Sequence, residues 1–177
     1  MVAAVALPVA PACAHTPYAQ WDIFRKRNLQ ILTSHADLPG DEVGEDWVAV
    51  LREKLPLSRA MVSRAHDFPR VAALLKTNQS KLAVLSYMHA RLIFTGSPPF
   101  EDYAPLPLEV LVDDGKYLLV TRPDLPLHHG FLIATTLMSE AGKLHLVDPG
   151  KGKFGMPVHA GARAYLNGEK LEMPTES

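Results

Sequence analysis

The sequence predicts an α/β domain with three layers, in which a mostly parallel sheet carries helices on both faces. Short apolar runs rich in β-branched residues alternate along the chain with segments whose apolar residues recur at helical spacing. That alternation favours parallel strands joined by right-handed crossovers. The chain has 177 residues, 47% of them hydrophobic and 21% charged, which is sufficient to bury the core of one domain.

The first half of this domain is predicted to hold three buried strands and two helices. Pro56 ends the first helix, and Asp67 is expected to cap the second, with Pro69 in its first turn. Pro39 and Gly40 indicate a loop after the first strand. The expected elements are strands at 29–33, 59–63 and 82–85, helices at 41–55 and 67–78, and loops at 34–40 and 86–89.

The second half is predicted to form a hairpin followed by a long helix. Asp113-Asp114-Gly115 is a turn signal between two apolar runs, which favours an antiparallel pair. The expected elements are a loop at 95–107, strands at 108–112 and 116–121, a helix at 127–140, a short strand at 144–147, a loop at 150–155, and a loop entering a short helix at 156–166.

Residues 1–22 are predicted to be a leader that precedes the single domain at 23–177. Positions 2–14 are almost all small or apolar, a run too short to span a bilayer but typical of the apolar part of a secretion signal. Ala12-Cys13-Ala14 offers a cleavage site, although Cys13 is alternatively a lipid acceptor, and positive residues are missing before the apolar run. We therefore expect an exported, periplasmic protein with an incomplete leader. A single cysteine excludes an intramolecular disulfide and a thiolate zinc cluster.

The charge pattern argues against nucleic acid as a partner. The net charge is −1 and the basic residues are scattered, whereas a phosphate-binding face needs a cluster of Lys and Arg. The tightest group, Arg25-Lys26-Arg27, is interpreted as a solvated entry to a strand or helix.

The tail resembles that of TAXI-type solute-binding proteins, the receptors of a class of TRAP transporters. Pro157, His159, Gly161, Ala162 and Tyr165 match the pattern of those tails. Segments 82–90 and 108–123 also resemble parts of the same proteins. The resemblance implies one lobe of a type II periplasmic binding protein and a non-catalytic function in uptake or sensing. It also implies a small organic acid or amino-acid-like ligand, and a membrane transporter or sensor as partner.

This chain departs from that family in two ways. The loop at 34–44 has only Gly40 and Gly44 where those proteins usually carry a loop rich in glycine and threonine, and no second lobe fits between 96 and 108. A single lobe cannot bury a ligand from both sides. The alternative is therefore an accessory protein that keeps the scaffold without a ligand and uses the exposed half-cleft as a docking face or homodimer interface.

A ligand site is expected at the carboxyl ends of the strands, where the loops at 33–40 and 86–89 converge. Helix N-termini there suit a carboxylate, and Arg122 would pair with an acid group in a bidentate manner. Alternatively, the hydroxyls cap helices and turns, and the acidic residues at 41–46 repel an anion. The predicted ligand-binding residues are Thr33, Ser34, Pro39, Gly40, Ser86, Tyr87, Met88 and Arg122.

The eight histidines support a third hypothesis, a metal-dependent enzyme. His128 and His129 are adjacent and cannot form the i, i+4 pair of a helix-borne zinc site, but His35, His89 and His159 fall on loops that would meet near the strand ends. No nucleophile elbow, dinucleotide fingerprint or phosphate-binding loop is present. We therefore predict no catalytic residue, no cofactor and no metal.

Overall fold

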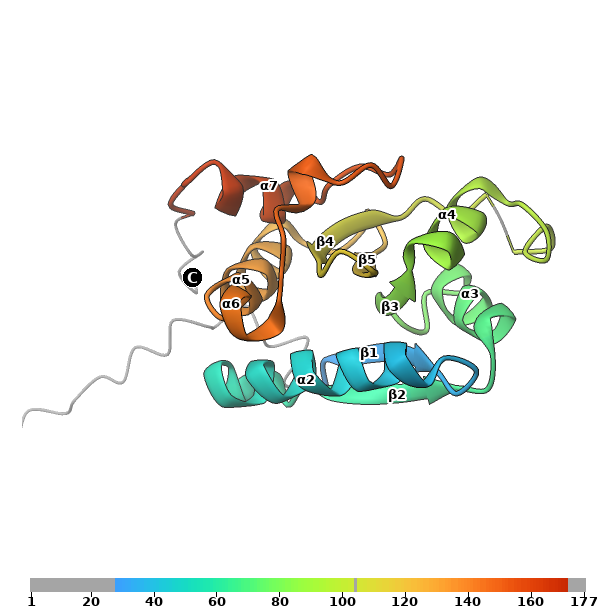
Figure 1. Cartoon of the computed structure of the whole chain (residues 1–177), viewed down its shortest axis with the longest axis horizontal. Coiled ribbons are helices and arrows are strands. Elements are labelled where there is room, and N and C mark those ends of the chain that lie inside the picture. Colours follow the sequence, from blue (N-terminus) through green and yellow to red (C-terminus); the bar gives the residue numbers. More distant parts are fainter. Residues whose placement is uncertain (1–27, 104, 172–177) are drawn as a thin grey trace, which may run out of the picture.

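The computed structural model describes residues 28–103 and 105–171 (Figure 1). The predicted leader and the basic group at 25–27 lie outside the described residues. Five strands form one sheet in the order β2-β1-β3-β5-β4. The strands are β1 (Gln30–Ser34), β2 (Met61–Ala65), β3 (Leu82–Ser86), β4 (Glu109–Asp113) and β5 (Tyr117–Thr121). The helices are α2 (Leu38–Lys54), α3 (Phe68–Lys76), α4 (Tyr87–Thr95), α5 (Leu127–Met138), α6 (Ala141–Leu144) and α7 (Ala160–Leu166).

The sheet is mixed rather than mostly parallel. β1 pairs in parallel with β2 and β3, whereas β5 is antiparallel to both β3 and β4. Two of the four pairings are therefore parallel, and the expected mostly parallel sheet is not confirmed. The tight turn at Asp114-Gly115 reverses the chain after β4, and long-range pairing inserts the reversed strand β5 between β4 and β3, which makes the second pairing antiparallel as well.

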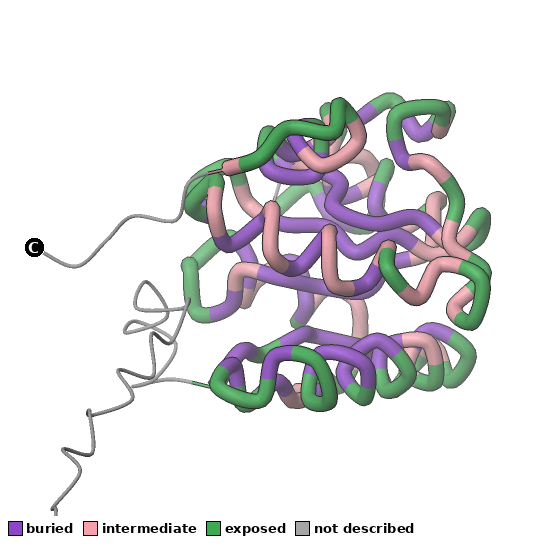
Figure 2. Tube along the Cα trace, turned by 90° about the vertical axis from the view of Figure 1, so that its left-hand side faces the viewer, coloured by how far each residue is buried: buried purple, intermediate pink, exposed green. Residues whose placement is uncertain are grey.

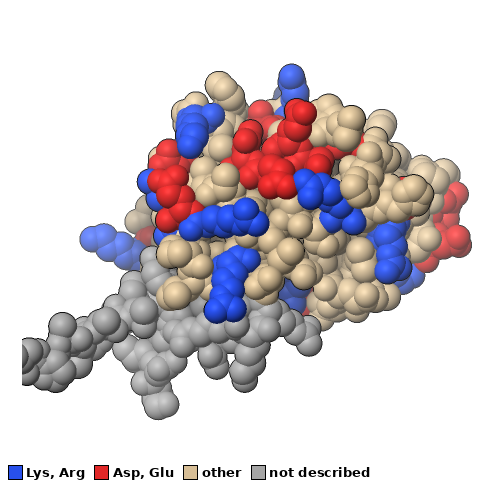
Figure 3. Space-filling view, turned by 90° about the horizontal axis from the view of Figure 1, so that it is seen from below, with Lys and Arg blue, Asp and Glu red and all other residues tan. Residues whose placement is uncertain are grey.

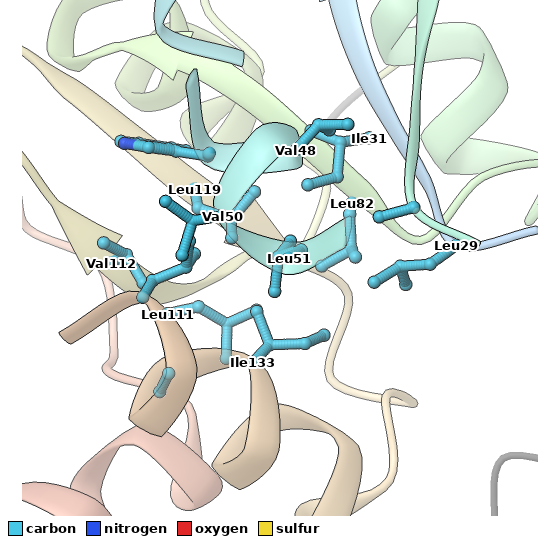
Figure 4. Packing of buried hydrophobic residues seen from close by; sticks show 14 of the residues in the cluster. Leu29, Ile31, Val48, Val50, Leu51, Leu82, Leu111, Val112, Leu119 and Ile133 are labelled. Carbon is cyan, nitrogen blue, oxygen red and sulfur yellow. The ribbon is translucent and has the colours of Figure 1, made fainter. Parts of the chain in front are cut away.

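Helices cover both faces of the sheet, each over its own hydrophobic core. Side chains of α2, α5 and α7 pack on one face, and side chains of α3 and α4 pack on the other. Successive strand residues divide between the two cores, as Ile31 and Leu32 do. Figure 2 shows the strands buried through the middle of the molecule, and Figure 4 shows Val48 and Leu51 of α2 gathered with strand residues and Ile133 of α5.

A β-bulge interrupts this alternation in β4. The register with β5 shifts between Val110 and Val112, so that Leu111 and Val112 both join the core under α2 and α5 while Val110 faces the opposite core. An extra residue in one strand of an antiparallel pair produces this change of side.

Several expected elements are confirmed. Asp67 caps α3, because its Oδ1 accepts a hydrogen bond from the Arg70 amide at 2.8 Å. The hairpin of β4 and β5 and the long helix α5 lie where the sequence predicts them.

Three local predictions were wrong. The loop at 34–40 is shorter than expected, because α2 begins at Leu38 with Pro39 in its first turn, where no amide donor is needed. The loop at 86–89 is the start of α4, which Ser86 caps. No strand forms at 144–147: Leu144 ends α6, and Val147 makes only an isolated bridge to Asp113.

The tail residues that carry the family resemblance hold α7 against α5. His159 caps α7 by accepting a hydrogen bond from the Gly161 amide on Nδ1 at 3.0 Å, while Nε2 lies 3.1 Å from the Leu125 carbonyl. A Cβ on Gly161 would lie 2.3 Å from the Phe131 amide nitrogen of α5, so only glycine permits this approach. These residues therefore have a structural role in the fold.

Candidate functional site

The carboxyl ends of three strands meet the N-termini of three helices at one edge of the sheet. β1 leads into α2, β2 into α3 and β3 into α4. Ser86 pairs with Tyr117 across β3 and β5, so the turn between β4 and β5 lies at the same edge. We call this region the strand-end edge; its residues are Ser34, Asp37, Asp67, Ser86, Tyr87, Asp113 and Tyr117.

Each of these helix N-termini is capped by a side chain of the chain itself. Asp37 accepts a hydrogen bond from the Gly40 amide at 3.3 Å, and Asp67 caps α3 in the same way. Ser86 accepts from the His89 amide at 3.4 Å. Two of the three caps are carboxylates, which already complement the helix dipoles. The amides that bond to these caps are therefore not free to bind the anion expected at these N-termini.

Two tyrosine–aspartate hydrogen bonds tie the edge together. The Tyr117 hydroxyl donates to Asp37 Oδ1 at 2.8 Å, and the Tyr87 hydroxyl donates to Asp113 Oδ1 at 2.5 Å. Burial, followed by the hydrogen bond to Asp37, raises the pKa of Tyr117 to about 12. Burial and the Asp113 carboxylate likewise raise the pKa of Tyr87 well above its usual value. Both hydroxyls therefore remain donors at neutral pH.

The two aspartates differ in their surroundings. Asp113 is fully buried, and its Oδ1 also accepts a hydrogen bond from the Gly115 amide at 2.7 Å. Its Oδ2 has no hydrogen-bond partner within residues 28–103 and 105–171. Asp37 is only partly buried. Because an unsatisfied buried carboxylate oxygen is costly, Asp113 depends strongly on its two donors.

Ser86 and His89 form a short polar contact on the first turn of α4. Ser86 Oγ lies 2.8 Å from His89 Nδ1, and the imidazole stacks on Phe68 with ring centroids 3.5 Å apart. Burial lowers the pKa of His89, and the charge of Asp37 opposes this shift only in part. No carboxylate of the described chain hydrogen-bonds to His89, so the pair lacks the orienting group of a catalytic triad.

Two predicted ligand residues are instead bound into the local structure. Thr33 is buried beneath α2 and donates its hydroxyl to Asp41 at 2.6 Å. The Ser34 hydroxyl, also buried, accepts a hydrogen bond from the Ala36 amide at 3.2 Å. The alternative interpretation, in which these hydroxyls stabilise turns and helices, describes both residues.

Gly40 permits the contact between Tyr117 and Asp37. A Cβ at this position would lie 2.8 Å from Asp37 Oδ2 and 2.9 Å from Tyr117 Cε1. Both distances are shorter than a Cβ atom normally keeps from a non-bonded heavy atom. Gly40 therefore contributes by having no side chain, which leaves room for Tyr117 to reach Asp37. Its neighbour Pro39 is exposed and lines a groove.

The structure does not bring Arg122 together with the other predicted ligand residues. Thr121 pairs with Leu82, at the start of β3, so Arg122 lies at the opposite edge of the sheet. Its Nη1 donates to the Leu75 carbonyl at 2.9 Å, and its Nε lies 3.0 Å from Asp124. The antiparallel direction of β5 explains this placement. Arg122 contacts the C-terminal end of α3 and is a structural residue.

The three histidines proposed for a metal site do not form one. His159 is buried against Leu125, which follows β5, while His35 is exposed after β1. In the part of the chain that the structure describes, no group of three His, Cys, Asp or Glu residues is arranged to hold a metal ion.

A groove of about 440 Å³ lies between α2, the β4–β5 turn and α6; we call it the α2 groove. The buried ring of Trp47 contributes to its lining, and Val43, Tyr117 and Leu144 add apolar surface. Its charged lining residues are Glu42 and Asp46 from α2, Asp114 and Lys116 from the turn, and Lys143 from α6, and the C-cap of α6, His145, lies beside them.

A second groove, of about 360 Å³, lies beside the first turns of α4; we call it the α4 groove. Tyr87 and Met88, both predicted ligand residues, line it. Its remaining lining residues are Arg91, Leu92, Lys153 and Phe154. In contrast to the α2 groove, its charged residues are all cationic.

Sequence reasoning missed most of the residues that line these grooves. Lys143 and Lys153 stand in segments without a motif, and Arg91 lies in a helix that was not predicted. The Trp47 side chain is only 1% exposed, as expected of a large apolar residue in the core. The i, i+4 spacing of Glu42 and Asp46 was the one available signal of a charged helix face.

No family model matches the chain, and neither a curated protein nor a solved structure matches it. Within the described residues, no helix has the length and apolar character needed to cross a membrane.

Proposed function

We propose that this chain is a non-catalytic binding protein that recognises a small amino-acid-like ligand in the α2 groove. The observation that carries the proposal is a groove that α2 lines with the carboxylates of Glu42 and Asp46 and α6 lines with the Lys143 ammonium group. Asp114 and Lys116 of the turn add one charge of each sign, and the rest of the lining is largely apolar. A ligand with both an ammonium and a carboxylate group complements that arrangement.

The carboxylates of α2 divide into a paired set and a free set. Arg64 of β2 lies 2.8 Å from Asp41 and 2.5 Å from Glu45. Glu42 and Asp46 lie one residue further along the helix, line the groove, and have no ion pair within the described chain. Figure 3 shows acidic side chains gathered on the face of α2 and β2 with Lys and Arg beside them. The free pair is available to a ligand ammonium group.

Lys143 of α6 supplies positive charge to the groove. Lys143 stands in the last turn of α6, and His145 is its left-handed C-cap. Neither side chain forms an ion pair within residues 28–103 and 105–171. The Lys143 ammonium group suits a ligand carboxylate. A simple organic acid would be attracted to α6 but repelled by Glu42 and Asp46, so we favour the amino-acid-like ligand over the organic acid.

Size and lining also support a small ligand. The volume of about 440 Å³ falls within the range of roughly 300–1,000 Å³ typical of ligand sites. The lining includes Trp47 and Leu144, which would contact a ligand side chain. Because one lobe leaves the groove open to solvent, we expect weak affinity, with a Kd of roughly 10 μM to 1 mM.

The wider proposal is that this is an exported, periplasmic protein that serves a transporter or sensor. The resemblance of Pro157, His159 and Gly161 to the tails of TAXI-type solute-binding proteins supports it, as does the α/β fold with helices on both faces of one sheet.

The test is a titration followed by the fluorescence of Trp47 in a Trp21→Phe background. Common amino acids are compared with the matching acids that lack the amino group and with the matching amines that lack the carboxylate. We expect at least one amino acid to bind about tenfold more tightly than either analogue, a difference of about 1.4 kcal/mol. Equal binding of the acid analogue would contradict the charge argument.

Variants locate the site. Glu42→Gln and Lys143→Gln should each weaken binding, because each removes one of the two complementary charges. Glu53→Gln on the same helix and Lys170→Gln on the surface are matched controls, since neither residue lines the groove. If the controls weaken binding as much as the groove variants, the ligand binds elsewhere.

A further inference from the structure

The α4 groove lies on the other face of the sheet from the α2 groove. Tyr87, Leu92 and Phe154 pack against the core that α3 and α4 cover. Val43, Tyr117 and Leu144, which line the α2 groove, pack against the core that α2 and α5 cover. The two grooves are therefore separate sites, and their chemistry is independent.

The charged lining of the α4 groove has one sign. Arg91 and Lys153 are exposed, and neither forms an ion pair or side-chain hydrogen bond within the described chain. Among the described residues, no Asp or Glu lines the groove. A guanidinium beside an ammonium group suits a carboxylate, which Arg binds in a bidentate manner.

The remaining lining is apolar and aromatic. The rings of Tyr87 and Phe154 meet edge to face, with centroids 6.0 Å apart. Met88 is 61% exposed although it is large and apolar, and Leu92 lies beside it on α4. An exposed methionine next to aromatic rings offers an adaptable surface for an apolar chain. The Tyr87 hydroxyl is already bonded to Asp113, so the ring contributes its apolar surface.

We propose that the α4 groove binds a small amphipathic carboxylate, with the acid group between Arg91 and Lys153 and an apolar chain against Met88, Leu92 and Phe154. This site takes a ligand with one charge and one apolar tail, whereas the α2 groove takes a ligand with two opposite charges. Failure of either proposal leaves the other standing.

The experiment uses octanoate as the probe and follows backbone amide shifts of the full chain by NMR. We expect saturable shifts concentrated in residues 87–92 and 153–154. Octylammonium, which has the same tail and the opposite charge, should bind at least about tenfold more weakly. Comparable binding of the two probes, or shifts concentrated at the α2 groove, would overturn the proposal.

Two series of measurements separate the contribution of the ligand's charge to binding from that of its apolar tail. Arg91→Gln and Lys153→Gln should each weaken octanoate binding, whereas Arg70→Gln, an exposed arginine of α3, should not. Across hexanoate, octanoate and decanoate, each added CH₂ should tighten binding by up to about fourfold. Met88→Ser should reduce that dependence on length. If the affinity changes neither with chain length nor in Arg91→Gln, the proposed site is contradicted.

Discussion

The two sides of the strand-end edge use the same pair of side chains in different surroundings. On one side, Tyr87 donates to the fully buried Asp113; on the other, Tyr117 donates to the partly buried Asp37. The first pair holds α4 to β4, and the second holds β5 to α2. Because burial sets the penalty for an unpaired carboxylate, the first pair should contribute more to stability than the second. The second pair lies beside the α2 groove, where water can replace a lost hydrogen bond to Asp37.

The largest expected effect comes from Tyr87→Phe. This variant leaves Asp113 with the Gly115 amide as its one remaining donor in the described structure. We expect the free energy of unfolding to fall by about 1–3 kcal/mol, measured by chemical denaturation. Tyr165→Phe is the control, since that hydroxyl makes no hydrogen bond within the described residues. A loss equal to that of the control would mean that the buried pair is not stabilising.

Gly40→Ala tests whether the contact between Tyr117 and Asp37 requires a residue without a side chain at position 40. Alanine normally stabilises a helix relative to glycine by about 1 kcal/mol. Here the new Cβ would lie 2.9 Å from the Tyr117 ring, so we expect a net loss of about 1–2 kcal/mol. Gly142→Ala in α6, where a Cβ meets nothing within 4 Å, should be neutral or stabilising. A gain in stability from Gly40→Ala would show that Tyr117 moves away freely.

Tyr117→Phe should have a smaller effect than Tyr87→Phe. Asp37 is partly exposed and keeps the Gly40 amide as a donor, so water replaces the lost hydroxyl. We expect a loss of about 0.5–1.5 kcal/mol. Denaturation of both tyrosine variants side by side gives the order directly, and a larger loss for Tyr117→Phe would reverse the comparison.

The smallest expected effect is a loss of folding stability at acidic pH through protonation of His89. The fold holds the pKa of His89 below the unfolded value of 6.5, mainly through burial. The unfolded chain therefore binds the proton more readily, and this contribution to stability is present above pH 6.5 and is lost as the pH falls below it. An NMR titration of the imidazole should give a midpoint below 6.5. A midpoint above that value would indicate that Asp37 outweighs burial.

Local features of the fold could be predicted from the sequence, while long-range features could not. The Asp67 cap and the Asp-Gly turn depend on residues close together in the chain, and both are confirmed. The position of β5 between β3 and β4 depends on pairing between distant segments. It places Arg122 at the end of the sheet opposite the predicted ligand site. Helix α4 was missed because Ser86, its cap, also fits a turn.

The site was harder to predict than the fold for the same reason. Tyr117 and Asp37 are 80 positions apart, and Lys143 and Glu42 line the same groove although they lie in distant parts of the sequence. Hydroxyl residues after a strand suggested ligand contacts, yet the Thr33 hydroxyl donates to the Asp41 carboxylate and the Ser34 hydroxyl accepts from the Ala36 amide. Neither groove corresponds to a contiguous motif.

The most direct test of the central claim is NMR mapping of the amino acid that binds best in the fluorescence titration. The account predicts saturable amide shifts at Glu42, Trp47, Tyr117 and Lys143, the residues that surround the α2 groove, and their loss in Lys143→Gln. Shifts confined to residues 87–92, or shifts that persist unchanged in Lys143→Gln, would contradict the assignment of an amino-acid-like ligand to this groove.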